Sequence, residues 1–294
     1  MSLTDEVPGE GAPTGPAGPD QRWIRRSYAD LFGSDSGPLG HRITRSGAEL
    51  WVAADLVIKV HAHRTDPEQL ARQLAAVEVA PEVWVPPQRV EVQLSPDGRA
   101  ITAWPRVHVL DHDSLSHEEA PPWGEARSLL ERWHALSADH PPMGDLPGHD
   151  PAVRLGRARE RLRATPYDSS LGAVGDRLLA ELADRDEDVR QPVHGDWHLG
   201  QLGQTRDGWR LLDVDDVALG DPVWDLARPA GWWAAGLISD EDWSAFGGRE
   251  VAWASVDLPA RCAVFLTASR VADPATEAVD APETAVCAEI CLQW

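Results

Sequence analysis

Residues 193–227 decide how the rest of the chain is interpreted, and they read VHGDWHLGQLGQTRDGWRLLDVDDVALGDPVWDLA. The pair Asp207-Gly208 within them is a strong signal for a two-residue hairpin turn. With this pair as the turn, Gln201 lies opposite Val214 and next to Asp213. The local sequence therefore brings an amide oxygen and a carboxylate together.

Asp196 lies in the loop that enters this hairpin, so a second carboxylate is close to Gln201 and Asp213. Oxygen ligands with open coordination positions suit Mg²⁺, which keeps water molecules and shares substrate phosphates. Phosphoryl transfer to an alcohol also needs a separate carboxylate that accepts the hydroxyl proton. An aspartate base, an amide five residues later and a metal-binding aspartate after a further strand is the layout of protein kinases.

The order and spacing of further motifs resemble the aminoglycoside phosphotransferase family of small-molecule kinases, which includes enzymes like choline kinase. The resemblance implies an α+β, bilobal fold like that of protein kinases, with a small β-rich N-terminal lobe and a larger, mainly helical C-terminal lobe. It also implies Mg²⁺, ATP or GTP as phosphate donor, and a hydroxyl of a small molecule as acceptor. The motifs are His194-Gly195-Asp196, Leu212-Asp213, Gly220-Asp221-Pro222 and Asp225-Leu226-Ala227.

The resemblance implies roles for individual residues. Asp196 corresponds to the catalytic base, and His194 to the residue beside it that holds the catalytic loop. Asp213 corresponds to the aspartate that binds the nucleotide phosphates through Mg²⁺. Gln201 stands where most of the family has Asn, but it keeps the amide oxygen, as in maltokinases. Asp225 is expected to steady the loop and the start of a helix.

Lys59 is the only lysine in the chain, against 26 arginines. It lies in the apolar run 57–60, which resembles the strand of kinases whose lysine contacts the nucleotide phosphates. A compact ammonium fits a tight phosphate site better than the larger guanidinium fork. Upstream, Ser46-Gly47 is the expected loop over the phosphates.

The kinase resemblance also implies a glutamate on the next helix as the partner of Lys59. The residue at the expected position is Gln73, with Glu68 and Glu78 nearby, and we favour Glu68. The nucleotide is expected in the cleft at the linker between the lobes. The residues predicted to contact it there are Trp104, Arg106 and Val107.

Length and composition fit this outline, because 294 residues make about two lobes. We expect a disordered tail over residues 1–20, a nucleotide-binding lobe over 21–104 and a catalytic and acceptor-binding lobe over 105–294. In the first lobe we expect one helix after Pro67 and strands over 49–54, 56–60, 82–92 and 100–104. In the second we expect helices over 124–138, 152–164, 171–185, 222–235, 240–254, 258–271 and 282–293.

The formal net charge of −21 argues against binding to nucleic acid or to an anionic membrane surface. It fits a cationic acceptor, and equally a generally acidic proteome. No apolar run approaches the roughly 20 residues of a membrane helix. Three cysteines rule out a disulfide framework and favour a reducing cytoplasm.

Four residues are candidates for acceptor binding. Asp215 and Asp216 could bind a second metal or a cationic acceptor, or form a solvated strand end. Trp232 and Trp233 could stack on a sugar or a base, or pack in the core.

Three functions remain open. A single lysine and no asparagine are typical of a GC-rich genome, which together with the acidity favours an antibiotic phosphotransferase acting on a cationic or other antibiotic. The alternative is a metabolic sugar or amino-alcohol kinase, which Gln201 favours through its likeness to maltokinases. A pseudokinase that only binds a ligand is disfavoured by the intact Lys59, Asp196 and Asp213.

Overall fold

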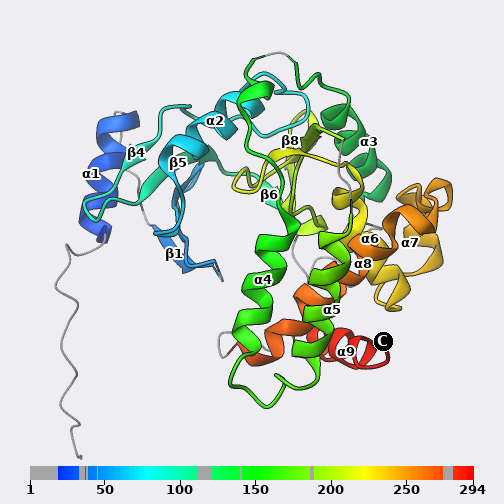
Figure 1. Cartoon of the computed structure of the whole chain (residues 1–294). Coiled ribbons are helices and arrows are strands. Elements are labelled where there is room, and N and C mark those ends of the chain that lie inside the picture. Colours follow the sequence, from blue (N-terminus) through cyan, green and yellow to red (C-terminus); the bar gives the residue numbers. More distant parts are fainter. Residues whose placement is uncertain are drawn as a thin grey trace, which may run out of the picture.

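A computed structural model describes residues 19–32, 37, 39–44, 46–110, 121–139, 141–185, 189–273 and 281–294. A five-stranded antiparallel sheet comes first and a mainly helical part follows, which confirms the α+β class (Figure 1). The expected tail falls outside the described residues except for its last two. The division at residues 104 and 105 stays a prediction.

The described helices are α1 (Gln21–Phe32), α2 (Pro67–Glu78), α3 (Trp123–His134), α4 (Pro151–Leu162), α5 (Leu171–Ala183), α6 (Val223–Ala234), α7 (Asp240–Ala245), α8 (Trp253–Ala268) and α9 (Ala281–Cys291). The described strands are β1 (Gly40–Ile43), β2 (Glu49–Val52), β3 (Leu56–Val60), β4 (Gln93–Leu94), β5 (Ala100–Pro105), β6 (His108–Val109), β7 (Gln191–Val193), β8 (Leu202–Thr205), β9 (Gly208–Leu211) and β10 (Ala218–Gly220).

The first sheet has the strand order β1-β2-β3-β5-β4 and is covered on one face by α1. Every second side chain of β3, from Leu56 to Val60, is buried in one cluster with Ile24 and Tyr28 of α1. Side chains alternate between the faces of a strand, so Lys59 lies on the opposite face. The sequence predicted one helix in this region, and α1 is a second one.

Two expected elements differ in the structure. The strand expected over 82–92 is replaced by turns, with one isolated bridge from Trp84 to Leu211. Two consecutive prolines in this segment lack the N–H that a continuous strand needs. The helix expected over 240–254 ends early, because Gly247 adopts a left-handed conformation with φ of 78°.

The β8–β9 hairpin forms, but its turn lies one residue earlier than expected. Arg206 and Asp207 form the turn, and Gly208, with φ of 104°, is the first residue of β9. Gln201 therefore lies opposite Leu212, whose N–H donates to the Gln201 carbonyl over 2.9 Å. The expected partner Val214 is wrong, yet the amide still comes to the end of β9.

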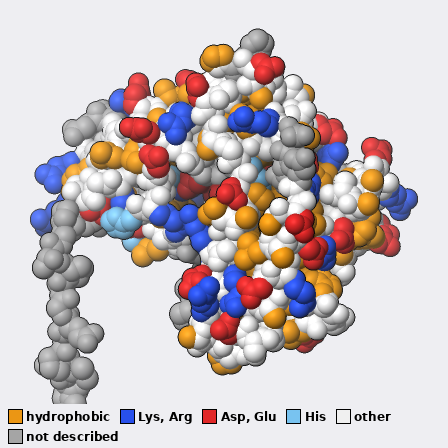
Figure 2. Space-filling model, viewed as in Figure 1, with side chains coloured by type: hydrophobic (Ala, Val, Ile, Leu, Met, Phe, Trp, Pro, Cys, Tyr) orange, Lys and Arg blue, Asp and Glu red, His pale blue; other side chains and the backbone are white. Residues whose placement is uncertain are grey.

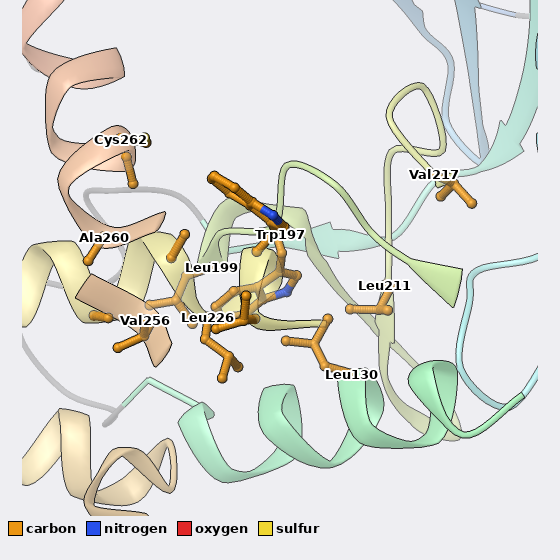
Figure 3. Close-up of a cluster of buried hydrophobic side chains, with 14 of the residues drawn as sticks. Leu130, Trp197, Leu199, Leu211, Val217, Leu226, Val256, Ala260 and Cys262 are labelled. Atoms are coloured by element: carbon orange, nitrogen blue, oxygen red, sulfur yellow. The ribbon is translucent and has the colours of Figure 1, made fainter. Parts of the chain in front are cut away.

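The loop that carries Asp196 is anchored in the helical core by apolar side chains. Trp197 and Leu199 are buried, and Figure 3 shows them among Leu130 of α3, Leu226 of α6 and Val256 of α8. Burial of such large side chains contributes about 1.5–3 kcal/mol each. The loop is therefore held by packing on both sides of its polar residues.

A buried carboxylate fixes the start of the same loop. Asp225, in the first turn of α6, accepts the N–H groups of His194 at 2.8 Å and Gly195 at 2.9 Å. The ring of His134 on α3 lies 2.8 Å from the same carboxylate. Burial alone would raise the pKa of Asp225, but the hydrogen bond and charge of His134 outweigh it and lower the pKa.

Helix α2 connects the first sheet to the loop after β9. Leu70 and Leu74 are fully buried in the main core. Between them, the Gln73 side chain donates to the carbonyls of Asp215 at 3.0 Å and Val217 at 2.9 Å. An amide suits this place because it can donate to two carbonyls, which a carboxylate cannot do.

On the face drawn in Figure 2, acidic and basic side chains alternate over the helical part and form no single acidic patch. No helix within the described residues is long and apolar enough to cross a membrane.

The Gln73 contacts predict that two substitutions at this position destabilise the protein to different degrees. We expect Gln73→Ala to cost about 1–3 kcal/mol of stability, because two carbonyls lose their donor. Gln73→Glu should cost more, because it adds a buried charge beside those carbonyls. Urea unfolding measures both, with Gln69→Glu on the same helix as control. A Gln73→Glu variant as stable as the parent would contradict this role.

The Asp225 contacts predict a pH-dependent stability. We expect Asp225→Asn to cost about 3–5 kcal/mol, because it breaks a buried ionic and hydrogen-bonded group. The folded pKa is lowered, so this stabilisation is complete above the unfolded value of roughly 4 and is lost as the pH falls through the folded pKa.

Unfolding curves between pH 3 and pH 7 test this, with exposed Asp184→Asn as control. A gap between Asp225→Asn and the parent that stays constant throughout this range would contradict the account.

Candidate active site

Lys59 of β3 pairs with two carboxylates from the segment after β9. Its Nζ lies 2.7 Å from Oδ1 of Asp213 and 3.0 Å from Oδ2 of Asp215. Burial lowers the pKa of Lys59, but these two charges outweigh it and raise the pKa above its usual range. The only lysine of the chain is therefore a fixed cation between β3 and the segment after β9.

Asp215 has a second basic neighbour. The buried His61 ring places Nδ1 3.3 Å from Oδ2 of Asp215, and its Nε2 lies 2.8 Å from the Thr102 hydroxyl. Asp215 is thus a counterion of Lys59, and the expected solvated strand end is wrong for it. Glu68 is also wrong as the partner of Lys59, since it is exposed in the first turn of α2.

Cross-strand pairing brings the linker to the same face as Lys59. Lys59 lies opposite Thr102 on β5, and Trp104 follows two residues later on the same face, where its Nε1 donates to the Thr102 hydroxyl over 2.8 Å. Arg106 is tied to the β2–β3 turn through the Asp55 carbonyl at 2.8 Å. Trp104 therefore lies on the same face of the sheet as Lys59.

The other linker and loop residues are placed as follows. Val107 contacts Gly203 of β8 closely, so that a side chain at 203 would collide with it. Ser46 and Gly47 form the exposed turn between β1 and β2, and the Ser46 carbonyl accepts from Arg64 over 2.9 Å. This turn lies beyond the end of β3 that carries Lys59, where a loop over phosphates is expected.

Gln201 and Asp213 offer oxygen atoms that suit a hard cation. Gln201 is buried, and its Oε1 has no hydrogen-bond partner among the described residues. Asp213 adopts a left-handed conformation with φ of 65°, which is uncommon for a residue other than glycine. Because Mg²⁺ binds through one or two protein oxygens, substrate phosphates and water, this pair fits it.

The described residues contain no group of three or more His, Cys, Asp or Glu side chains arranged for a metal. A metal site that takes further ligands from the phosphates of its substrate does not require three such side chains.

Asp196 is held by two arginines from different helices. Its Oδ1 accepts from Arg154 of α4 at 2.7 Å and from Arg228 of α6 at 2.8 Å. Arg154 also donates to the Gly195 carbonyl over 2.7 Å. Gly195 has φ of 81°, and a Cβ there would collide with the Asp216 carbonyl, so glycine is required.

The arginines set the protonation of Asp196. Burial raises its pKa, but the charges of Arg154 and Arg228 outweigh burial and bring the pKa well below its usual range. Asp196 is therefore ionised at neutral pH, with Oδ1 occupied. Oδ2 is the oxygen left for another donor.

His194 lies behind the site and does not line the pocket beside Asp196. It is fully buried, its ring stacks on Trp84 at 5.1 Å, and its Nε2 donates to the Leu212 carbonyl over 2.9 Å. His194 thus joins the loop to the strand before Asp213, which is a positioning role.

The two tryptophans expected at the acceptor lie elsewhere. Trp233 donates to Asp240 over 2.7 Å and stacks on Trp243 at 5.6 Å. Trp232 lies under the Arg228 guanidinium at 5.9 Å. The tryptophans that line the pocket beside Asp196 are Trp197 and Trp224.

Sequence reasoning missed three residues of the site. Arg228 follows Asp225 by three positions on a helix, so helical spacing could have placed both on the face toward the loop. His61 follows Lys59 by two positions, so strand alternation puts it on the same face. Arg154 has no local signal, because α4 reaches Asp196 only through the tertiary fold.

Solved structures share this fold at low identity. The choline kinase LicA from Streptococcus pneumoniae matches with a TM-score of 0.65 and 13% identity, over 93% of this chain and 99% of that chain. APH(2″)-IIIa in complex with GDP and kanamycin matches with a TM-score of 0.63 and 13% identity, over 92% and 97%. APH(4)-Ia in complex with AMP-PNP and hygromycin B matches with a TM-score of 0.63 and 13% identity, over 91% of this chain and 97% of that chain.

These matches establish the kinase-like fold that the motifs implied. No curated protein sequence matches the chain. The profile of the phosphotransferase enzyme family, APH, matches residues 45–265, which is most of the chain and includes the motifs from Lys59 to Asp225. The chain belongs to the APH phosphotransferase family.

Proposed function

We propose that the protein transfers the γ-phosphate of ATP or GTP to a hydroxyl group of a small molecule. The observation that carries the proposal is the placement of Asp196 beside a pocket while Lys59 and Asp213 form an ion pair at 2.7 Å. Asp196 would contact the acceptor, and Lys59 and Asp213 would contact the phosphate donor.

The donor side rests on positive charge and oxygen ligands. Lys59 would contact the nucleotide phosphates, with Trp104, Arg106 and Val107 bordering the base and Ser46-Gly47 above the phosphates. Asp213 and Gln201 would hold Mg²⁺, which supplies charge neutralisation at the phosphates when bound. Two structural relatives form complexes with GDP and with AMP-PNP, which supports a nucleotide donor.

The acceptor side rests on Asp196. Its Oδ2 would accept a hydrogen bond from the acceptor hydroxyl and so orient the oxygen toward phosphorus. The lowered pKa makes Asp196 a weak base, so the proton moves to it late, when the new O–P bond is largely formed. Positioning and electrostatics then supply most of the rate, as is usual in phosphoryl transfer.

For the acceptor we propose an antibiotic, with a metabolic sugar or amino alcohol as the alternative. The complexes with kanamycin and hygromycin B support the first class, and the match to a choline kinase supports the second. A pseudokinase is disfavoured because Lys59, Asp196 and Asp213 are all in place.

Asp196→Ala tests the proposed base. We expect kcat to fall by roughly 10²–10⁴-fold with nucleotide affinity unchanged, because the proposal gives Asp196 no contact with the nucleotide. Release of ADP or GDP and nucleotide calorimetry measure the two quantities. Asp207→Asn in the β8–β9 turn is the matched control. Normal turnover by Asp196→Ala would refute the assignment.

Gln201→Ala tests the proposed metal ligand. We expect the Mg²⁺ concentration for half-maximal turnover to rise by roughly 10–100-fold, because a protein oxygen is lost. Gln201→Asn should restore part of the affinity, since it keeps the amide oxygen. A Mg²⁺ dependence of Gln201→Ala equal to that of the parent would exclude Gln201 from the metal site.

A further inference from the structure

A pocket of about 460 Å³, part of it open to solvent, lies directly beside Asp196. Its walls come from α4, α6, α8 and the loop that carries Asp196. An acceptor whose hydroxyl reaches Asp196 must therefore place part of its body here.

The charged side chains that line this pocket are two arginines and one aspartate, namely Arg154, Arg228 and Asp196. Two guanidinium groups thus face one carboxylate within the lining, while Asp216 and Asp213, which are not part of it, also act on Arg154 through their charge. Nearby carboxylates, Asp196 first among them, raise the pKa of Arg154 against the effect of burial, so Arg154 stays charged.

The contacts to Asp196 use only part of what the arginines offer. Both guanidinium groups reach the same oxygen, Oδ1, through one Nη2 atom each, and Arg154 adds one bond to a carbonyl. A guanidinium carries five N–H donors in a planar fork that matches a carboxylate or a phosphate. The remaining donors are available to a further oxyanion in the pocket.

The rest of the lining limits the alternatives. Apart from His149, the other lining residues are apolar or glycine, including Leu155, Pro259 and Leu266. An acceptor with several ammonium groups would meet two guanidiniums here and no free carboxylate pair. Ammonium and guanidinium groups repel each other, and the repulsion is stronger in a partly buried site than in water.

We propose that the acceptor is an acidic hydroxyl compound, which carries a carboxylate or phosphate group that Arg154 and Arg228 bind beside its reacting hydroxyl. The inference rests on the proposed phosphotransfer and names its acceptor class. In the reaction the hydroxyl oxygen forms a bond to the γ-phosphorus. The bond from that phosphorus to the β-phosphate oxygen breaks, ADP or GDP leaves, and the hydroxyl proton passes to Asp196.

Matched acceptors test this by release of ADP or GDP in the presence of Mg²⁺. One set is a hexose, its uronic acid and its amino sugar, and the other is glycerol, glycerate, glycerol phosphate and aminopropanediol. We expect kcat/KM for an acidic member to exceed that of its neutral partner by at least about tenfold, with the amine lowest. Glycerate against glycerol phosphate separates the two oxyanions.

Arg154→Gln separates acceptor binding from a purely structural role. We expect KM for the acidic acceptor to rise about tenfold or more with KM for nucleotide unchanged, and the preference over the neutral partner to shrink. An arginine that only positions Asp196 would lower kcat equally for every acceptor. The exposed Arg157→Gln on the same helix is the control.

A preference for the amino compounds, or an equal loss of kcat with all acceptors, would overturn the inference and leave the phosphotransfer standing. If no member turns over, calorimetry with AMP-PNP decides, because acidic members that fail to bind overturn it and acidic members that bind support it. Failure to bind any nucleotide would instead contradict the proposed function itself.

Discussion

The buried carboxylate of Asp225 is the contact on which the site depends. It accepts hydrogen bonds from two consecutive backbone N–H groups, those of His194 and Gly195. It also lies in contact with Nε2 of the His134 ring. Because the N–H groups belong to the two residues before Asp196, this carboxylate sets where the loop starts. Gly195, in a left-handed conformation, and the buried Trp197 flank Asp196, whose side chain lines the pocket.

Three carboxylates of the candidate site, those of Asp196, Asp213 and Asp215, are held by a cation from another element. Lys59 of β3 holds Asp213 and Asp215, and Arg154 with Arg228 hold Asp196. Pairing of this kind keeps the acids ionised and their oxygens fixed. In the proposed reaction, the lysine serves the donor side and the two arginines serve the acceptor side.

Much of this arrangement was predictable because it is local in sequence. The hairpin that joins Gln201 to Asp213 and the strand that carries Lys59 follow from patterns within a few residues, whereas the anchoring role of Asp225 was implied by the family resemblance. The errors arose where local patterns compete. Asp207-Gly208 has the chemistry of a turn, but the structure uses Arg206-Asp207 and keeps Gly208 for its positive φ.

What the sequence could not predict depends on contacts between distant elements. Gln73 does not replace a glutamate as partner of Lys59 but bonds two carbonyls, and Asp215 takes the counterion role.

The central claim is tested most directly by phosphorus NMR of the protein with ATP or GTP, Mg²⁺ and hydroxyl acceptors. The account predicts a new phosphate monoester as the γ-phosphate signal disappears, and no monoester with Asp196→Ala. Inorganic phosphate as the only product, or the same monoester from Asp196→Ala, would contradict it.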